Sequence, residues 1–114
     1  MVLDHLGLAG GSVEVDRAVL ELAAAGHVWT KLSAPYRTAP GAAAAMVRRL
    51  VSRAGTSRLL WGSDWPWTGF EGRHDYRACL DWAAGLLDAG ALGAVLVDNP
   101  RRLLGWSPRA GSVV

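Results

Sequence analysis

The chain has 114 residues, of which 51% are hydrophobic and 19% charged, so it holds enough apolar material for one ordinary globular domain. Its formal net charge of +2 and its scattered basic residues argue against a nucleic-acid-binding protein. The single cysteine, Cys79, excludes an intramolecular disulfide, and no apolar window approaches the roughly 20 residues of a membrane span. The start lacks the pattern of a signal peptide, so we expect a cytoplasmic protein.

The first part of the chain predicts a strand, a helix and a second strand. Residues 2–3 form the stub of a strand that ends at Asp4-His5 and a glycine-rich turn. A helix is expected over about residues 13–25, because apolar residues recur there with helical spacing. The expected apolar face consists of Val15, Ala18, Val19 and Leu22. Residues 27–33 are rich in β-branched and aromatic residues, which favours a strand.

The alternation of strands and helices continues in the second part. Pro40 suits the first turn of a helix. The apolar face of that helix is Ala43, Met46, Val47, Leu50 and Val51. Residues 58–61 predict a third strand, and residues 75–87 predict a third helix. The aligned positions of the third helix are Tyr76, Leu80, Ala83 and Leu87.

The last part of the chain is less clear. Residues 91–97 fit a strand or a short helix equally well. Asn99-Pro100 predicts a helix start, with Asn99 as the cap, and that helix should end near Gly105. We expect residues 1–106 to form one α/β domain with a parallel sheet and residues 107–114 to form a flexible tail.

Polar residues follow each of the three predicted strands. Because the carboxyl ends of parallel strands share one edge of a sheet, and ligands bind at that edge in α/β proteins, these residues should meet there. They are Asp4, His5, Lys31, Ser33, Tyr36, Arg37, Ser63 and Asp64. A histidine can polarise a carbonyl, bind a metal or move protons, an aspartate can take a proton from water, and an arginine can hold a carboxylate.

Each of these residues also has a purely structural interpretation. His5 suits a turn after a strand, and Asp64 suits a turn before Trp-Pro. Arg37 can be a solvated loop residue, and Lys31 can face outward from its strand. Two other histidines, His27 and His74, are expected at the surface, and Cys79 is expected in the core. The sequence contains no His-x-His, Cys-x-x-Cys or His-Glu-x-x-His pattern and no phosphate-binding loop with its lysine.

Four segments, residues 2–7, 28–37, 60–66 and 97–106, occur in order and together resemble the C-terminal part of the amidohydrolase-related family, the family 2 branch of the amidohydrolase superfamily. The resemblance is greatest to the 2-pyrone-4,6-dicarboxylate hydrolase group, which includes sugar lactonases. It implies a distorted (β/α)8 TIM barrel of about 250 residues or more. This chain would then hold about three strands with their flanking helices, and the barrel would be incomplete.

The resemblance also implies roles for the residues at the sheet edge. His5 would help to polarise the substrate carbonyl, and Asp64 would be the general base that activates water. Arg37 would grip a substrate carboxylate. The remaining expected substrate-binding residues are Tyr36, Ser33 and Lys31. Trp67 stands where family members often have a histidine, which leaves the substrate open.

The resemblance further implies a function and its alternatives. We expect a hydrolase that directs water at a lactone or related carbonyl of a small carboxylated substrate, without a cofactor. Because the family's N-terminal His-x-His is absent, the chain alone should have little activity. One alternative is a relative of the metal-dependent decarboxylases, in which Asp64 and His5 would bind a divalent metal such as zinc. Another is a non-catalytic remnant that serves as an assembly module, and a homo-oligomer through exposed sheet edges is possible in either case. No nucleic acid or membrane partner is expected.

Overall fold

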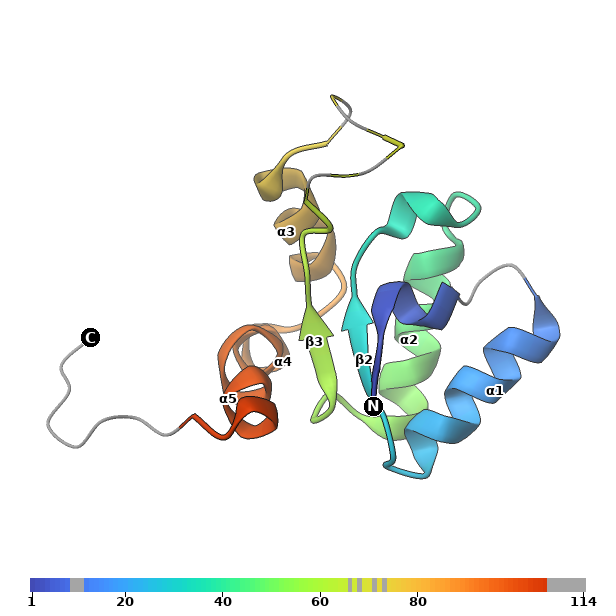
Figure 1. Cartoon of the computed structure of the whole chain (residues 1–114), viewed down its shortest axis with the longest axis vertical. Helices are drawn as coiled ribbons and strands as arrows, with labels where there is room; N and C mark the ends of the chain where they lie inside the picture. The colour runs from blue at the N-terminus through green and yellow to red at the C-terminus, as the bar shows by residue number, and fades with distance from the viewer. Residues whose placement is uncertain (9–11, 66, 68, 71, 73, 107–114) are drawn as a thin grey trace, which may run out of the picture.

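The three predicted strands form one parallel sheet in a computed structural model of the chain (Figure 1). The strands are β1 (Val2–Leu3), β2 (Trp29–Leu32) and β3 (Leu59–Trp61), in the order β1-β2-β3. The structure describes residues 1–8, 12–65, 67, 69–70, 72 and 74–106. The predicted tail at 107–114 therefore lies outside the described residues.

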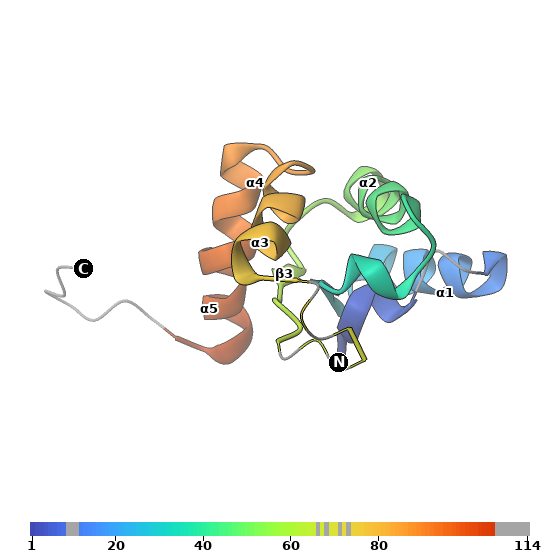
Figure 2. The same cartoon turned by 90° about the horizontal axis from the view of Figure 1, so that it is seen from above.

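Helices and short helical turns connect and follow the strands. The helices are α1 (Val13–Ala24), α2 (Ala42–Ala54), α3 (Tyr76–Ala84), α4 (Ala89–Gly93) and α5 (Asn99–Leu104), with the short segments η1 (Asp4–Leu8), η2 (Pro35–Arg37) and the π-helical η3 (Ala94–Asp98). In Figure 1, α1 and α2 lie together beside β2, whereas α3, α4 and α5 gather beside β3. Figure 2 shows the same grouping from above.

The core lies between the sheet and the helices. Parallel pairing sets Leu32 beside Trp61 and Thr30 beside Leu59, so these side chains share one face of the sheet. The buried cluster on this side comprises Leu6, Val19, Leu20, Leu32, Ala43, Met46, Val47, Leu50, Leu59 and Val95. Four of the five residues predicted for the apolar face of α2 belong to it, so that prediction is confirmed.

The predicted apolar face of α1 is partly wrong. Val19 is buried as expected, but Val15 and Leu22 are each 38% exposed, and Leu20 is 7% exposed. The helix packs mainly against α2, and the stripe that it buries there runs from Val19 and Leu20 to Ala23. Because α2 packs against this side of α1, the buried face of α1 is rotated by about one residue from the predicted face.

Two predicted helix boundaries and one predicted apolar-face position also differ in the structure. The helix expected at Pro40 begins at Ala42, because Gly41 has a left-handed backbone (φ 79°) that a helix cannot contain. The third helix ends at Ala84, three residues early, although Leu87 still packs against the core. Its first residue, Tyr76, is 55% exposed, because it follows the Asp75 cap and contacts a loop residue instead of the core.

The ambiguous region at 91–97 is helical. Residues 89–104 form one continuous run through α4, η3 and α5, which ends at Gly105 with φ 71°. Asn99 is therefore not a cap, because it has helical backbone angles within the run. Its buried side chain donates instead to the carbonyl oxygens of Thr56 (2.6 Å) and Leu59 (2.8 Å), which ties the run to the start of β3. None of the helices in the described part of the chain combines the length and apolar character needed to cross a membrane.

Candidate active site

Five of the six predicted site residues meet at the carboxyl ends of the strands. His5 lies in η1 directly after β1, Ser33 follows β2, and Tyr36 and Arg37 lie in η2. Asp64 lies in the loop after β3. That loop leaves the sheet at the same end as the segment after β2 (Figure 1). The contacts described below join all five side chains into one network, as expected for the edge of a parallel sheet.

His5 is set by an unusual turn of the backbone. His5 (φ 51°) and Leu6 (φ 58°) both have left-handed conformations, which are uncommon for residues other than glycine. The side chain of Leu6 is buried in the core and anchors the turn. Gly7 follows with φ 67°, and a Cβ there would lie 2.8 Å from Cγ2 of Val19. Glycine is therefore needed to let this turn approach α1, and the turn presents His5 to Ser33, whose Oγ is 2.8 Å from its Nδ1.

Asp64 is both a turn residue and the centre of the network. Its φ is 62°, and its carbonyl accepts a hydrogen bond from the Trp67 backbone N–H at 2.7 Å. Its carboxylate Oδ2 accepts from the Tyr36 hydroxyl and from Arg37, whose Nε is 3.0 Å and whose terminal nitrogen is 2.9 Å away. The other oxygen, Oδ1, lies 3.4 Å from Nε2 of His5. Asp64 thus occupies the turn expected from its structural interpretation and also lies at the centre of the predicted site residues.

The surroundings of Asp64 favour its ionised form. Burial raises the pKa of this carboxyl, but the hydrogen bonds from Tyr36 and Arg37 and the electrostatic influence of His5 and Arg37 outweigh burial. The net result is a pKa below the usual range, so Asp64 is a carboxylate at neutral pH. The same contact acts in the opposite direction on the phenol: burial and donation to Asp64 raise the pKa of Tyr36.

The ionised carboxylate also indicates which nitrogen of His5 carries a proton. An oxygen of Asp64 near Nε2 favours a hydrogen there, so in the neutral ring Nδ1 accepts from the Ser33 hydroxyl. His5 then presents an N–H donor, as the polarising role requires. Ser33, His5 and Asp64 lie in series like a serine-hydrolase triad, but Ser33 is only 2% exposed, which argues against a nucleophilic serine.

Lys31 lies in a separate ion pair. Its Nζ is 2.7 Å from Oδ1 of Asp4, and both side chains reach solvent. The hydrogen bond from Lys31 lowers the pKa of Asp4, with the charges of Lys31 and His5 adding to this effect. A Cβ on Gly62 would lie 2.8 Å from Cδ of Lys31, so the lysine stem packs over the glycine that follows β3. Lys31, the sixth predicted site residue, therefore pairs with Asp4 and is not part of the five-residue network.

His74 is a member of the site that the sequence did not reveal. It was expected at the surface, but it is half-buried and its ring stacks on that of Tyr36, with centroids 4.0 Å apart and an angle of 20° between the planes. Phe70 packs against the same phenol ring at 4.9 Å, and the Arg37 guanidinium lies 5.3 Å from the Phe70 ring. We call Tyr36, Phe70 and His74 the aromatic cluster. The one available signal was that Phe70 and His74 lie in the loop after β3, on the ligand-binding side of an α/β sheet.

The network offers few donors for a metal ion. Within the described part of the chain, no three His, Cys, Asp or Glu side chains gather in a possible metal site. His5 and Asp64 provide two donors, and Arg37 already binds one oxygen of the Asp64 carboxylate. These residues alone do not fit the coordination of a catalytic zinc, which takes three protein ligands.

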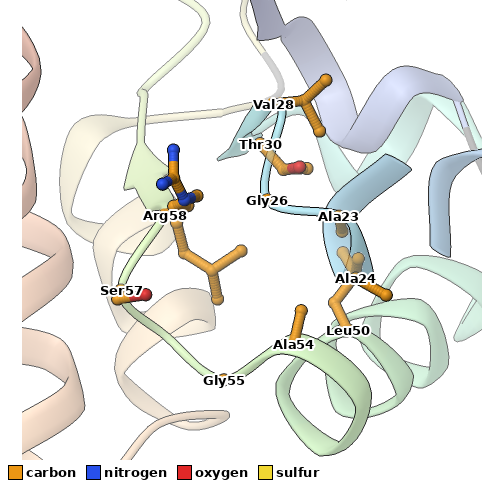
Figure 3. Close-up of a pocket in the computed structure, with 11 residues that line it drawn as sticks. Ala23, Ala24, Gly26, Val28, Thr30, Leu50, Ala54, Gly55, Ser57 and Arg58 are labelled. Carbon is orange, nitrogen blue, oxygen red and sulfur yellow. The ribbon is translucent and has the colours of Figure 1, made fainter. Parts of the chain in front are cut away.

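A partly enclosed pocket lies at the opposite end of the sheet. It has a volume of about 120 Å³ and is formed where α1 and α2 end and β2 and β3 begin (Figure 3). Small residues, among them Ala23, Gly26, Ala54 and Gly55, leave this space open. The pocket is remote from Asp64 and belongs to the packing of the helix ends.

Comparison with known proteins shows which family and which relatives the chain resembles. A family model described as Amidohydrolase matches residues 1–106. The chain is 32% identical to a 4-sulfomuconolactone hydrolase of Rhizobium radiobacter, over 92% of this chain and 39% of that protein. It is 28% identical to a D-galactarolactone isomerase of Agrobacterium fabrum, over 94% of this chain and 41% of that protein.

A solved structure shows the same relationship. A Pseudomonas putida protein described as a 2-pyrone-4,6-dicarboxylic acid hydrolase superimposes with a TM-score of 0.78 and 30% identity, over 95% of this chain and 44% of that one. The chain thus spans about two fifths of the length of these relatives. The predicted fold, part of a (β/α)8 barrel with three parallel strands, is confirmed.

Proposed function

We propose that this chain, which belongs to the amidohydrolase family, supplies the water-activating side of a lactone-hydrolase active site. The observation that supports this most is the asymmetry of Asp64. One carboxylate oxygen accepts hydrogen bonds from Tyr36 and Arg37 and also pairs with the terminal guanidinium nitrogen, whereas the other oxygen, within the described residues, lies near His5 alone, at 3.4 Å. A relative named as a lactone hydrolase supports the same chemistry.

Asp64 is the proposed general base. Its Oδ1 takes a proton from the water that attacks the lactone carbonyl, while Oδ2 stays fixed by Tyr36 and Arg37. In the free chain these donors make Asp64 a weak base. A substrate carboxylate would compete for the Arg37 guanidinium, because arginine binds carboxylates in a bidentate manner. Loss of Arg37 from Asp64 would raise the pKa of the base once substrate is in place.

His5 is the proposed electrophilic partner. Its Nε2–H donates to the carbonyl oxygen as negative charge develops there in the tetrahedral intermediate. Ser33 orients the ring through its contact with Nδ1, and Asp64 favours the tautomer with the proton on Nε2. The left-handed backbone of His5 helps to fix the ring relative to Asp64, which gives both groups a set geometry before substrate binds.

The rest of the site must come from residues beyond this chain. The chain spans about two fifths of its relatives, and the sheet edge described here has residues from three strands only. We therefore expect the purified 114-residue chain to hydrolyse lactones very slowly or not at all. A turnover comparable with that of a full-length relative, measured on the isolated chain, would contradict this expectation.

The role of Asp64 can be tested in a chimera in which this chain replaces the matching segment of the 4-sulfomuconolactone hydrolase relative. We expect Asp64→Asn to lower kcat by about 100- to 10,000-fold, as for loss of a general base, with little change in KM. Asp98→Asn, at an exposed aspartate, is the matched control. Full turnover by the Asp64→Asn chimera would remove Asp64 from the role of base.

Independence from metal remains a prediction that the same chimera can test. After dialysis against a chelator, the lactonase proposal expects unchanged turnover. Loss of turnover that returns on adding zinc would favour the metal-dependent alternative, with His5 and Asp64 as two of the ligands.

A further inference from the structure

We propose that His74 is a positioning residue that holds the Tyr36 phenol against Asp64 by ring stacking. The consequence for catalysis rests on the proposed role of Asp64 as the base, but the positioning itself does not. A loop histidine that looks like a surface residue in the sequence would thereby control the general base without touching it.

The geometry of the aromatic cluster supports this inference. The rings of His74 and Tyr36 lie nearly parallel, at 20°, with centroids 4.0 Å apart, whereas Phe70 meets Tyr36 at 55°. A parallel stack restrains the phenol ring along its whole face. Because the hydroxyl is rigidly attached to that ring, restraining the ring also fixes the hydroxyl on Oδ2 of Asp64.

The surroundings of the His74 ring give a second observation. Its Nε2 is buried and has no hydrogen-bond partner within the described residues. An unpaired buried nitrogen destabilises the folded state, so this placement of the imidazole has to be offset by its contacts. Its closest ring contact in the cluster is with Tyr36. The buried, unpaired nitrogen therefore makes this position of His74 costly for folding, and the stack on Tyr36 offsets part of that cost.

The other groups around Asp64 show why Tyr36 has to be held. Arg37 shares Oδ2 with Tyr36, His5 faces Oδ1, and the carboxylate of Asp4 lies near enough to repel Asp64. Arg37 is the group that a substrate carboxylate would draw away. Tyr36 would then be the remaining donor on Oδ2 among those described above, so its position would set the orientation of the base.

The chain offers a clean spectroscopic test, because Tyr36 and Tyr76 are its only tyrosines. The Tyr36 hydroxyl proton, assigned by its loss in Tyr36→Phe, should exchange slowly with water in the NMR spectrum of the 114-residue chain. We expect His74→Ala to accelerate this exchange about 3- to 10-fold, the range that loss of one aromatic stacking contact supports. His27→Ala, at an exposed histidine, should leave it unchanged.

A conservative variant separates positioning from a merely structural role. His74→Phe keeps the stack and removes the unpaired nitrogen, so it should retain the slow exchange and raise Tm. Unchanged exchange in His74→Ala would overturn the proposal. If His74→Ala does not fold, faster exchange in a folded His74→Phe would overturn it equally.

The catalytic consequence is tested in the chimera by a double-mutant cycle. His74→Ala should lower kcat when Tyr36 is present and have little further effect in the Tyr36→Phe background, because the two residues act in series. Equal losses in both backgrounds would overturn the proposed route through Tyr36. If Asp64 proves not to be the base, the kcat results change, but the hydroxyl-exchange results still decide the positioning role.

Discussion

Backbone strain at single residues is concentrated around the candidate site. His5 (φ 51°), Ala34 (φ 51°) and Asp64 (φ 62°) all have left-handed conformations, and each follows the end of a different strand. Such positions cost about 1–3 kcal/mol each and persist where the surrounding structure requires them. Here the turns aim His5 and Asp64 at each other and start η2, which carries Tyr36 and Arg37. The turns that follow the strands therefore hold both the strained residues and the side chains of the network.

Replacing Tyr36 by phenylalanine should raise the pKa of the Asp64 carboxyl. The variant removes a hydrogen bond that favours the ionised form, so the pKa should move up toward its ordinary value. Titration of the Asp64 carboxyl carbon by NMR measures this directly. Tyr76→Phe is the control, because Tyr76 is exposed and contacts Trp67 instead. An unchanged titration in Tyr36→Phe would contradict the hydrogen bond as described.

At the scale of elements, the buried side chain of Asn99 helps to attach the helical run at residues 89–104 to the sheet, together with Arg102, which donates to the carbonyl of Ser57. Asn99 supplies hydrogen bonds to two carbonyl oxygens at the start of β3. We expect Asn99→Ala to lower the free energy of unfolding by about 2–3 kcal/mol, because it removes two hydrogen bonds and takes the amide donor from the buried Leu59 carbonyl. The neighbouring exposed Asp98, replaced by alanine, provides the control in urea denaturation. A loss no larger than that of the control would show that the contact contributes little.

The orientation of α1 makes a second prediction at this scale. Leu20 is 7% exposed and belongs to the core, whereas Leu22 is 38% exposed. Leu20→Ala should cost about 2–4 kcal/mol in unfolding free energy, and Leu22→Ala should cost less than about 1 kcal/mol. Thermal or urea denaturation of the two variants checks this, and the reverse order would support the face predicted from the sequence.

At the scale of the whole molecule, the Asp64 network makes stability depend on pH. Because the pKa of Asp64 is lowered in the folded chain, its contribution to the free energy of unfolding is complete above the unfolded value of about 4. That contribution is lost as pH falls through the lower pKa of the folded state. The chain should therefore become less resistant to urea between about pH 5 and pH 3.

A comparison of variants isolates the part due to Asp64. In Asp64→Asn the midpoint of urea denaturation should fall less over this pH window than in the original chain. Asp98→Asn should retain the original dependence, since Asp98 is exposed. Parallel curves for the original chain and Asp64→Asn would show that the network does not contribute to acid sensitivity.

The sheet edges also belong to this scale. In the described part of the chain, no strand pairs with the outer edge of β1 or of β3. Unpaired edges favour association with another strand, so the homo-oligomer expected from the sequence stays a prediction that light scattering of the purified chain would test.

The amino-acid sequence by itself determined the alternation of strands and helices, the apolar face of α2 and the set of polar residues after each strand. These features follow from local periodicity and from the rule that parallel strands bring their carboxyl ends together. The sequence could not place Leu22, Asn99 or His74. Whether Leu22 is buried depends on the angle at which α2 approaches, and the role of Asn99 depends on carbonyl groups about 40 residues away.

Only the tertiary structure decided that His74 belongs with Tyr36 and that Arg37 holds Asp64 in the absence of substrate. Both contacts join loops that follow different strands, across 38 and 27 residues of sequence. Local sequence patterns span only a few residues, so they cannot predict contacts between residues this far apart in the chain. The folded sheet creates these contacts by bringing the ends of β2 and β3 side by side, and side-chain geometry within a few ångströms then decides which donor reaches the carboxylate.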